Sequence, residues 1–246
     1  VIWSTTLLVI FSREPVDEAA TDAGPTGATR LFGAALGEAL RRPATWAALV
    51  LALVGGAAFE AVGAVAGPFL VDQGLSKAAV GWFFSGTIVA MFAGTAVSGV
   101  LADRVGHRRI VAAGLLYLAL VISATALAAW GYTGGSRAGL LVTLMLGVYL
   151  GIGLFAAASY ALFMDATDPR LGGTQFSTYM GATNACEMWS AWAGGRLIAA
   201  AGYPVAFVTL AAASLVALPA LAWLPGKREE AEKPPTGGEA GPGRAG

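Results

Sequence analysis

The chain has 246 residues and a formal net charge of +0 at pH 7; 57% of its residues are hydrophobic, 12% are charged, and the mean hydropathy is +0.68. This composition is typical of a helical membrane protein and argues against a soluble domain. The balanced charge argues against nucleic acid as a partner. The single cysteine, Cys186, excludes an internal disulfide, and one histidine leaves no Cys/His cluster for zinc.

The first 44 residues differ from the strongly apolar sequence that follows. Residues 1–11 are apolar but too short to cross a bilayer, and we interpret them as the end of a preceding transmembrane helix in an N-terminally truncated chain. Residues 12–44 are interpreted as a cytoplasmic central linker, flexible where Asp, Glu, Gly, Pro and Thr dominate. Within it, residues 31–42 predict either a short interfacial helix or more linker. The apolar face of that helix would comprise Phe32, Ala35, Leu36, Ala39 and Leu40.

Six apolar segments follow, each of a length that suits a membrane-spanning helix. They are residues 45–70, 79–102, 110–129, 139–163, 174–200 and 204–224. Residues 225–246 are dominated by Lys, Arg, Glu, Pro and Gly and predict a disordered tail. The sequence therefore predicts an all-α membrane protein whose six-transmembrane-helix bundle covers residues 45–224.

A compact charged turn, residues 99–109, joins the second and third segments. Gly106 permits the sharp reversal, and we expect Gly99 to let two helices approach closely. Asp103 can cap or pair where the first helix ends, and Arg104 closes that helix, where the macrodipole favours a cation.

The next three residues of the turn begin the following helix. Arg108 and Arg109 lie where the macrodipole disfavours a cation, so we expect carboxylates or lipid phosphates to hold them. His107 is expected to be a solvated loop residue and not a pH sensor.

The spacing G-x-L-A-D-R-x-G-x-R-R resembles the loop signature of the major facilitator superfamily, which lies between the second and third helices of each six-helix half. His107 departs from the Arg or Lys that is usual there. The resemblance implies that this loop is a conformational switch. Its residues would be Gly99, Asp103, Arg104, Gly106, Arg108 and Arg109.

The same resemblance covers essentially the whole chain as a C-terminal half, helices seven to twelve, with the end of helix six. Such a half is a 3+3 inverted repeat, and the spacing G-x-L-x-x-x-x-G of residues 99–106 recurs at residues 195–202, where the arginine cluster of the turn has been lost. Because the solute site of these proteins lies between two halves, the implied partners are the lipid bilayer, a small-molecule solute and the missing N-terminal half.

The distribution of Lys and Arg predicts the orientation in the membrane. Lys77 and Arg137 fall on one face, and Arg196 lies within a span, where we expect it to snorkel outward or, less simply, to guide an anionic substrate. By the positive-inside rule, the other face is cytoplasmic and includes the turn and the C-terminus of a multi-pass protein of the plasma (inner) membrane. That face carries Arg13, Arg30, Arg41, Arg42, Arg104, Arg108, Arg109, Arg170, Lys227, Arg228, Lys233 and Arg244.

Two carboxylates lie near the middle of predicted spans, Glu60 in the first and Glu187 in the fifth. A charge at that depth costs roughly a few kcal/mol unless it is protonated, paired or solvated, so it usually serves a substrate or ion pathway. Glu187 continues a face of small and polar residues, which favours a cavity over a structural hydrogen bond. For Glu60, tight helix packing at Gly63 and Gly67 explains the pattern equally well.

Further polar side chains of the spans could bind a solute or satisfy the fold. Gly67-Pro68 is expected to kink the first span or to stop it early. The candidate substrate and proton pathway comprises Glu60, Asn184, Glu187, Tyr160, Gln175 and Tyr179.

Two other stretches look like the muropeptide permease and acetyl-coenzyme A transporter branch of the superfamily. They are Phe59-Glu60-Ala61 with residues 67–76, and residues 168–180 with Asn184. This likeness implies proton-driven uptake of polar cell-wall fragments or related metabolites. An exporter of drugs or other amphiphiles and a non-transporting scaffold or receptor are the alternatives. Because G-x-S-x-G, Walker-type and H-E-x-x-H motifs are absent, we expect no enzyme activity, cofactor or metal.

Overall fold

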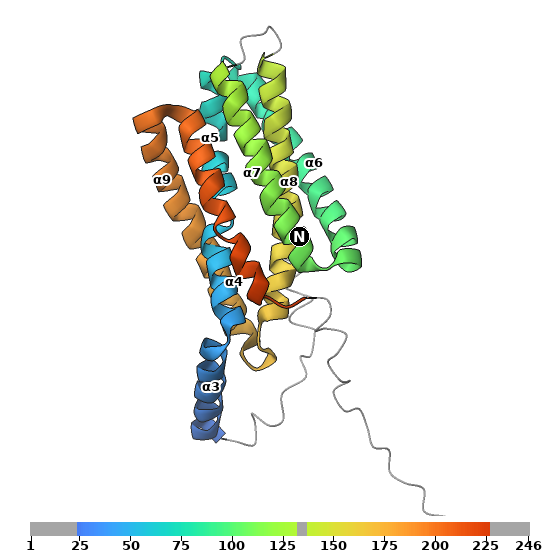
Figure 1. Ribbon diagram of the computed structural model, residues 1–246, viewed down its shortest axis with the longest axis vertical. Coiled ribbons are helices and arrows are strands. Elements are labelled where there is room, and N and C mark those ends of the chain that lie inside the picture. The colour runs from blue at the N-terminus through green and yellow to red at the C-terminus, as the bar shows by residue number, and fades with distance from the viewer. Residues whose placement is uncertain (1–23, 132–136, 227–246) are drawn as a thin grey trace, which may run out of the picture. The chain divides into compact units, whose positions relative to one another are not determined.

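The computed structural model describes residues 24–131 and 137–226, and all the regular structure in these ranges is helical (Figure 1). The helix end expected at residues 1–11 and nearly all of the expected tail lie outside the described residues. The chain divides into two compact units, one up to Arg41 and one from Arg42 onward.

The first unit contributes one described helix, α3 (Gly24–Arg41). It begins earlier than the segment that the apolar pattern marks out, and it ends with Arg41 in its last turn, where the macrodipole favours a cation. The larger apolar side chains of its predicted apolar face are exposed. They are Phe32, Leu36 and Leu40, whereas Ala35 and Ala39 of the same face are buried.

The second unit contains five helical stretches long and apolar enough to cross a membrane, and the fifth is folded into two arms. At Gly202 the backbone has φ 82°, a value that glycine adopts freely, and Pro204 follows. Figure 1 shows the chain of α9 running up one side and returning beside it, so the bundle has the six predicted spans. The elements are α4 (Pro43–Val54), α5 (Ala57–Asp72), α6 (Lys77–Val105), α7 (His107–Gly131), α8 (Arg137–Ala166), η1 (Pro169–Leu171), α9 (Gly172–Leu215) and η2 (Leu218–Trp223).

The first span is two helices, α4 and α5, separated at Gly55-Gly56. The chain was expected to kink or stop at Gly67-Pro68, but α5 continues through Pro68 to Asp72, so the predicted early stop is wrong. A Cβ at Gly55 would lie 2.6 Å from the carbonyl oxygen of Leu51 and 3.3 Å from the ring of Phe155. The break therefore occurs where a side chain would collide with the Leu51 carbonyl of α4 and would crowd the Phe155 ring of α8.

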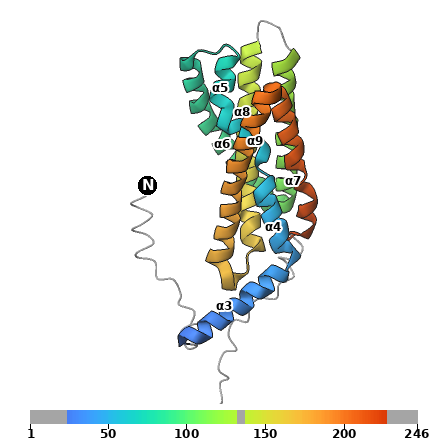
Figure 2. The same cartoon turned by 90° about the vertical axis from the view of Figure 1, so that its left-hand side faces the viewer.

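The closest helix contact lies between α6 and α8, and α6 stands at the edge of the bundle in both views (Figures 1 and 2). A Cβ at Gly94 would collide with the carbonyl of Leu150, and one at Gly153 would collide with the carbonyl of Met91. At Gly99 a Cβ would meet nothing within 4 Å, so the predicted close approach at that residue is wrong. Gly94, inside the same helix, has that role instead.

Because successive spans run in opposite directions, the connections between them lie at two opposite ends of the bundle. The end where α6 turns into α7, where α8 connects to α9 and where η2 finishes is called the turn end here (Figure 1). At the opposite end, Arg137 donates to the Gln73 side chain at 2.6 Å. The turn and the last described residues thus lie at the same end, as the distribution of Lys and Arg predicts.

Candidate functional site

A cavity of about 320 Å³ opens in the second unit, next to the break between α4 and α5. Its walls come from α4, α5, α6, α8 and the first arm of α9, residues 172–201. We call it the central cavity. It is defined here by Gly56, Glu60, Tyr149, Phe155, Tyr160 and Cys186.

Two side chains of α9 satisfy the backbone at the helix break. The hydroxyl of Ser214, on the second arm, accepts a hydrogen bond from the Ala58 amide at 2.8 Å. The indole of Trp189, on the first arm, donates to the carbonyl of Leu53 at 2.8 Å. A buried backbone group without a partner is costly, so these two bonds allow the span to be interrupted beside the cavity.

The helix break determines the electrostatic surroundings of Glu60. Since α5 begins at Ala57, Glu60 lies in the first turn of a new helix, where the amide ends of the macrodipole favour a negative charge. Its side chain is half-buried, lines the central cavity, and makes no hydrogen bond to any part of the chain that the structure describes. A carboxylate in this position is available to a proton or to a solute.

Glu187 lies close enough to Glu60 for the two carboxylates to repel each other. Its side chain is exposed on α9, as is that of Asn184, and neither residue lines the cavity. Among the described residues Glu187 has no side-chain hydrogen bond, so the alternative of a structural bond to a neighbouring helix is not realised. The structure thus brings the two predicted carboxylates together but places only Glu60 in the cavity wall.

Aromatic rings dominate the rest of the cavity wall. Phe59 and Phe155 pack with their ring centroids 5.5 Å apart, and the Tyr149 ring packs on Phe83 at 5.8 Å. Within the described ranges the hydroxyls of Tyr149 and Tyr160 have no hydrogen-bond partner. The cavity therefore offers apolar ring surfaces together with one carboxylate and two phenol groups, and its wall also includes Ser159, Thr183 and Cys186.

Gln175 and Tyr179 belong to a different place, a buried network at the turn end. The Gln175 amide donates to Tyr179 at 2.7 Å and to Thr45 at 3.2 Å, and its oxygen accepts from the Asp168 backbone at 2.8 Å. The network joins the start of α4 to the α8–α9 connection. We call it the turn-end cluster, and it comprises Arg42, Thr45, Asp168, Arg170, Gln175 and Tyr179.

Asp168 is the centre of this cluster, and only 3% of its surface is exposed. Arg170 donates to both carboxylate oxygens, at 3.1 and 2.8 Å, and Arg42 lies 3.3 Å away. The hydrogen bond from Arg170 lowers the pKa of Asp168 from 3.8 to about 2, aided by the charges of both arginines and opposed by burial. The carboxylate is therefore ionised at neutral pH.

The predicted switch loop forms the turn between α6 and α7. Gly106 has φ 91°, as its predicted role in the reversal requires, and Arg104 lies in the last turn of α6. His107 is not a solvated loop residue: it begins α7, and its Nδ1 lies 2.6 Å from Asp165 at the end of α8. The exposed side chains of Arg108 and Arg109 make no ion pair within the described part of the chain.

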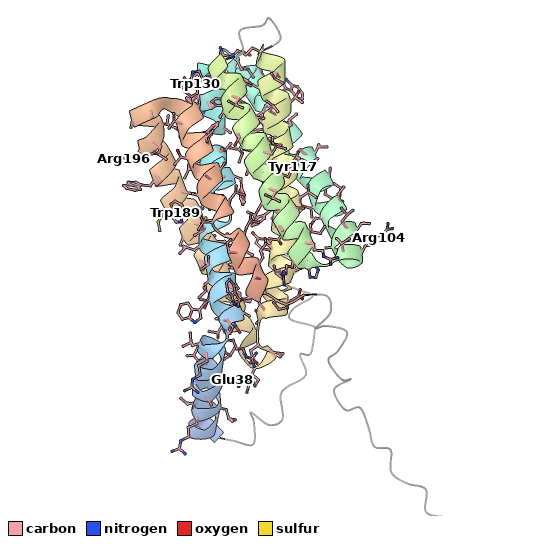
Figure 3. The ribbon with its side chains drawn as sticks, in the orientation of Figure 1. Glu38, Arg104, Tyr117, Trp130, Trp189 and Arg196 are labelled. Atoms are coloured by element: carbon pink, nitrogen blue, oxygen red, sulfur yellow. The ribbon has the colours of Figure 1, made fainter. Side chains whose placement is uncertain are left out.

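Two points remain, the position of Arg196 and the search for side chains that could hold a metal ion. Arg196 is exposed, and Figure 3 shows it on the outer side of α9, pointing away from the bundle. Across residues 24–131 and 137–226, no three His, Cys, Asp or Glu side chains gather where they could hold a metal ion.

Several site residues are not among the predicted candidates. Tyr149 is absent from the predicted solute pathway, and no local sequence signal marks Trp189 and Ser214 as partners of a helix break. The doubled glycine at 55–56 in an apolar run is the available signal, because glycine weakens a helix where it falls. Cys186 lines the cavity and is otherwise buried.

Comparisons with known proteins agree with this architecture. Residues 56–245 match the family model described as Major Facilitator Superfamily. The 3-(3-hydroxy-phenyl)propionate transporter of Escherichia coli (strain K12) is 34% identical over 128 residues, which are 52% of this chain and 30% of that protein.

Two solved structures share the fold. A crystal structure of the D-xylose-proton symporter has a TM-score of 0.57 at 16% identity and aligns with 77% of this chain and 48% of its own. The inward-open conformation of the xylose transporter XylE from E. coli has a TM-score of 0.58 at 16% identity, with 78% and 48% covered. The chain spans at most about half the length of these relatives.

Proposed function

Because the chain belongs to the major facilitator superfamily, we propose that it is the C-terminal half of a secondary transporter that moves a small solute by alternating access, coupled to protons. The all-α bundle is one half of the major facilitator fold and is embedded in a membrane. In this fold the solute site lies between two halves, so the chain supplies half of a site.

The observation that carries the proposal is the position of Glu60. It combines the first turn of an interrupted helix, a cavity wall and the absence of a hydrogen-bond partner among the described residues. Such a carboxylate can accept a proton when the cavity faces one side of the membrane and release it on the other. Glu187 adds to this, because a proton on either carboxylate removes the repulsion between them.

The class of solute follows from the cavity wall. The resemblance to the muropeptide permease branch suggests a polar, ring-bearing cell-wall fragment, while the transporter that is 34% identical is named for an aromatic acid. The central cavity has aromatic walls and few polar groups, which suits a solute with one flat ring and a few hydroxyls. We therefore rank aromatic metabolites as the first candidate solutes, muropeptides as the second and apolar drugs as the third.

The orientation belongs to the same proposal. The turn end carries Arg42, Arg104, Arg108, Arg109 and Arg170, and the positive-inside rule assigns this end to the cytoplasm of the inner membrane. The C-terminus would then be cytoplasmic. α3 would lie in the linker at the membrane surface, with the exposed side chains of Phe32, Leu36 and Leu40 toward lipid.

The test uses the full-length transporter, with its N-terminal half, in proteoliposomes. A panel of radiolabelled solutes, including 3-(3-hydroxyphenyl)propionate, a muropeptide and a cationic drug, is offered with and without an inward proton gradient. We expect accumulation of at least one solute that collapses when a protonophore is added. No proton-driven movement of any solute in either direction would contradict the proposal and favour a scaffold or receptor.

Two variants assign the coupling residue. Glu60→Gln should abolish proton-driven accumulation and leave exchange of labelled for unlabelled solute, because exchange needs no net proton movement. Arg196→Gln, a charge change on the outer side of α9, is the matched control and should transport normally. Normal accumulation by Glu60→Gln would contradict its role as the proton carrier.

A further inference from the structure

The charges around the central cavity decide which end of a solute this half can bind. Glu60 lies in the cavity wall with Glu187 close enough to repel it, and none of the described residues that line the cavity is Lys, Arg or His. The described basic side chains of the second unit belong to the two ends of the bundle, apart from Arg196, which points away from it (Figure 3). An anionic group beside Glu60 would therefore be repelled, and no described cation of this half would compensate.

Few polar side chains of the cavity wall are free to bind a solute. The hydroxyl of Ser159 donates to the Ala156 carbonyl at 3.1 Å, and the hydroxyl of Thr183 donates to the Met180 carbonyl at 2.7 Å. The Glu60 carboxylate and the phenol groups of two tyrosines have no hydrogen-bond partner among the described residues. These three groups are the ones through which the wall can recognise a polar atom.

The three free groups lie at different levels of the cavity. Tyr149 and Tyr160 are on α8, about 16 Å apart along an ideal helix, and Phe155 lies between them. The Phe155 ring packs on Phe59, which directly precedes Glu60 in the first turn of α5. The carboxylate therefore belongs to the middle level, where a flat solute lying against these rings can reach it with a group at the ring edge.

The group that reaches Glu60 has to tolerate both protonation states of this residue, because the proposed transport cycle adds a proton to it and removes it again. A carboxyl group accepts a hydrogen bond through its carbonyl oxygen when protonated and through either oxygen when ionised. A neutral O–H donor can stay bound in both states. An ammonium group loses its attraction when the proton arrives, and a carboxylate is repelled when the proton leaves.

We propose that this half of the transporter binds the hydroxyl-bearing ring of an aromatic solute. The ring hydroxyl donates a hydrogen bond to Glu60, and a carboxylate elsewhere on the solute faces the other half. Glu60 thereby determines specificity as well as carrying the proton. The inference rests on the proposed transport function, and it adds the chemical group that the cavity recognises and the direction in which the solute lies.

The test is isothermal titration calorimetry of the full-length transporter in detergent, which measures binding without a proton gradient. The matched ligands are 3-(3-hydroxyphenyl)propionate, 3-phenylpropionate, which lacks the hydroxyl, and 3-(3-methoxyphenyl)propionate, which keeps the oxygen but cannot donate. We expect the hydroxyl compound to bind about tenfold more tightly than either of the others, the effect of one hydrogen bond to a charged group.

Three variants assign this preference to Glu60. Glu60→Leu removes the acceptor and should bind the three ligands equally. Glu60→Gln keeps a carbonyl oxygen, so it should still prefer the hydroxyl compound, although it loses proton-driven accumulation. Thr183→Val is the matched control, because the Thr183 hydroxyl lines the cavity but donates to its own helix, and this variant should keep the full preference.

Failure of this inference is distinguishable from failure of the proposed function. Proton-driven accumulation without a preference for the hydroxyl would overturn the inference alone, whereas the preference without proton-driven accumulation would contradict only the proposed coupling. An unchanged preference in Glu60→Leu, tighter binding of phenethylamine than of 3-(3-hydroxyphenyl)propionate, or no binding of the hydroxyl compound would also overturn the inference.

Discussion

Glu60 and Asp168 are both carboxylates away from bulk water, and their surroundings are opposite. Asp168, in the turn-end cluster, has two arginines and a backbone amide as partners. Glu60, in the central cavity, has no hydrogen-bond partner in the described ranges and has another carboxylate nearby. The difference teaches that the bundle fixes one carboxylate in a closed polar cluster and leaves the other, beside the central cavity, available to a proton or a solute.

Replacing Asp168 should have the largest effect on the free energy of unfolding. Asp168→Ala leaves Arg170 and Arg42 without their carboxylate and removes the cap of η1, and we expect a loss of about 3 to 5 kcal/mol. Denaturant unfolding in detergent micelles, followed by circular dichroism, measures it. Asp165→Ala is the control, since its partly exposed pair with His107 should contribute less than about 1 kcal/mol. Equal losses of stability for the two variants would contradict the larger contribution expected of Asp168.

Acid should weaken the turn-end cluster in a defined range. Because the pKa of Asp168 is about 2 in the folded protein and 3.8 is its ordinary value, its contribution is complete above about pH 4 and is lost as the pH falls toward 2. We expect a loss of about 1 to 2 kcal/mol, since water near the arginines screens part of the interaction. Unfolding curves at pH 5, 3 and 2 measure it. An Asp168→Asn protein with the same pH dependence would exclude Asp168 as the cause.

The helix break should be sensitive to Ser214. Ser214→Ala leaves the buried Ala58 amide without its acceptor, which we expect to cost about 1 to 2 kcal/mol. Ser190→Ala is the matched control. Ser190 is equally buried, but its hydroxyl donates only to a carbonyl of its own helix, so a change below about 0.5 kcal/mol is expected. If Ser190→Ala cost as much as Ser214→Ala, the break would not depend on this bond.

Glu60→Gln should have the smallest effect on stability and the largest on transport. The amide has nearly the shape of the carboxyl group, and no partner within the described residues is lost, so we expect a change below about 0.5 kcal/mol in the free energy of unfolding. The same denaturant series measures it. A loss as large as that of Asp168→Ala would show that Glu60 is structural, and the contrast between the two regions would fail.

The sequence predicted the elements whose signals are local. Span lengths follow from hydropathy, and the reversal at Gly106 follows from a glycine between charged residues. The predictions that failed concern contacts between residues far apart in the sequence. Gly94 packs against Leu150, His107 pairs with Asp165, and the Ala58 amide donates to Ser214, 156 residues away.

The candidate site was predicted in part for the same reason. Glu60 was found because a carboxylate in an apolar span stands out. Glu187 lies on an exposed face of α9, and its cavity-facing role stays a prediction. In the sequence, Gln175 and Tyr179 cannot be distinguished from polar span residues that bind a solute. Only the hydrogen bonds of Gln175 to Thr45 and to the Asp168 backbone show that they belong to a structural cluster.

The interruption of the first span has a mechanical consequence. The carbonyl and the amide left open by the break are hydrogen-bonded to side chains on the two arms of α9. If α4 bent relative to α5, both hydrogen bonds would break, and hydrocarbon offers no replacement partner. Under the proposed alternating access, the helices around this joint would therefore move together with Glu60, and the motion between the two faces of the membrane would take place where the two halves of the transporter meet.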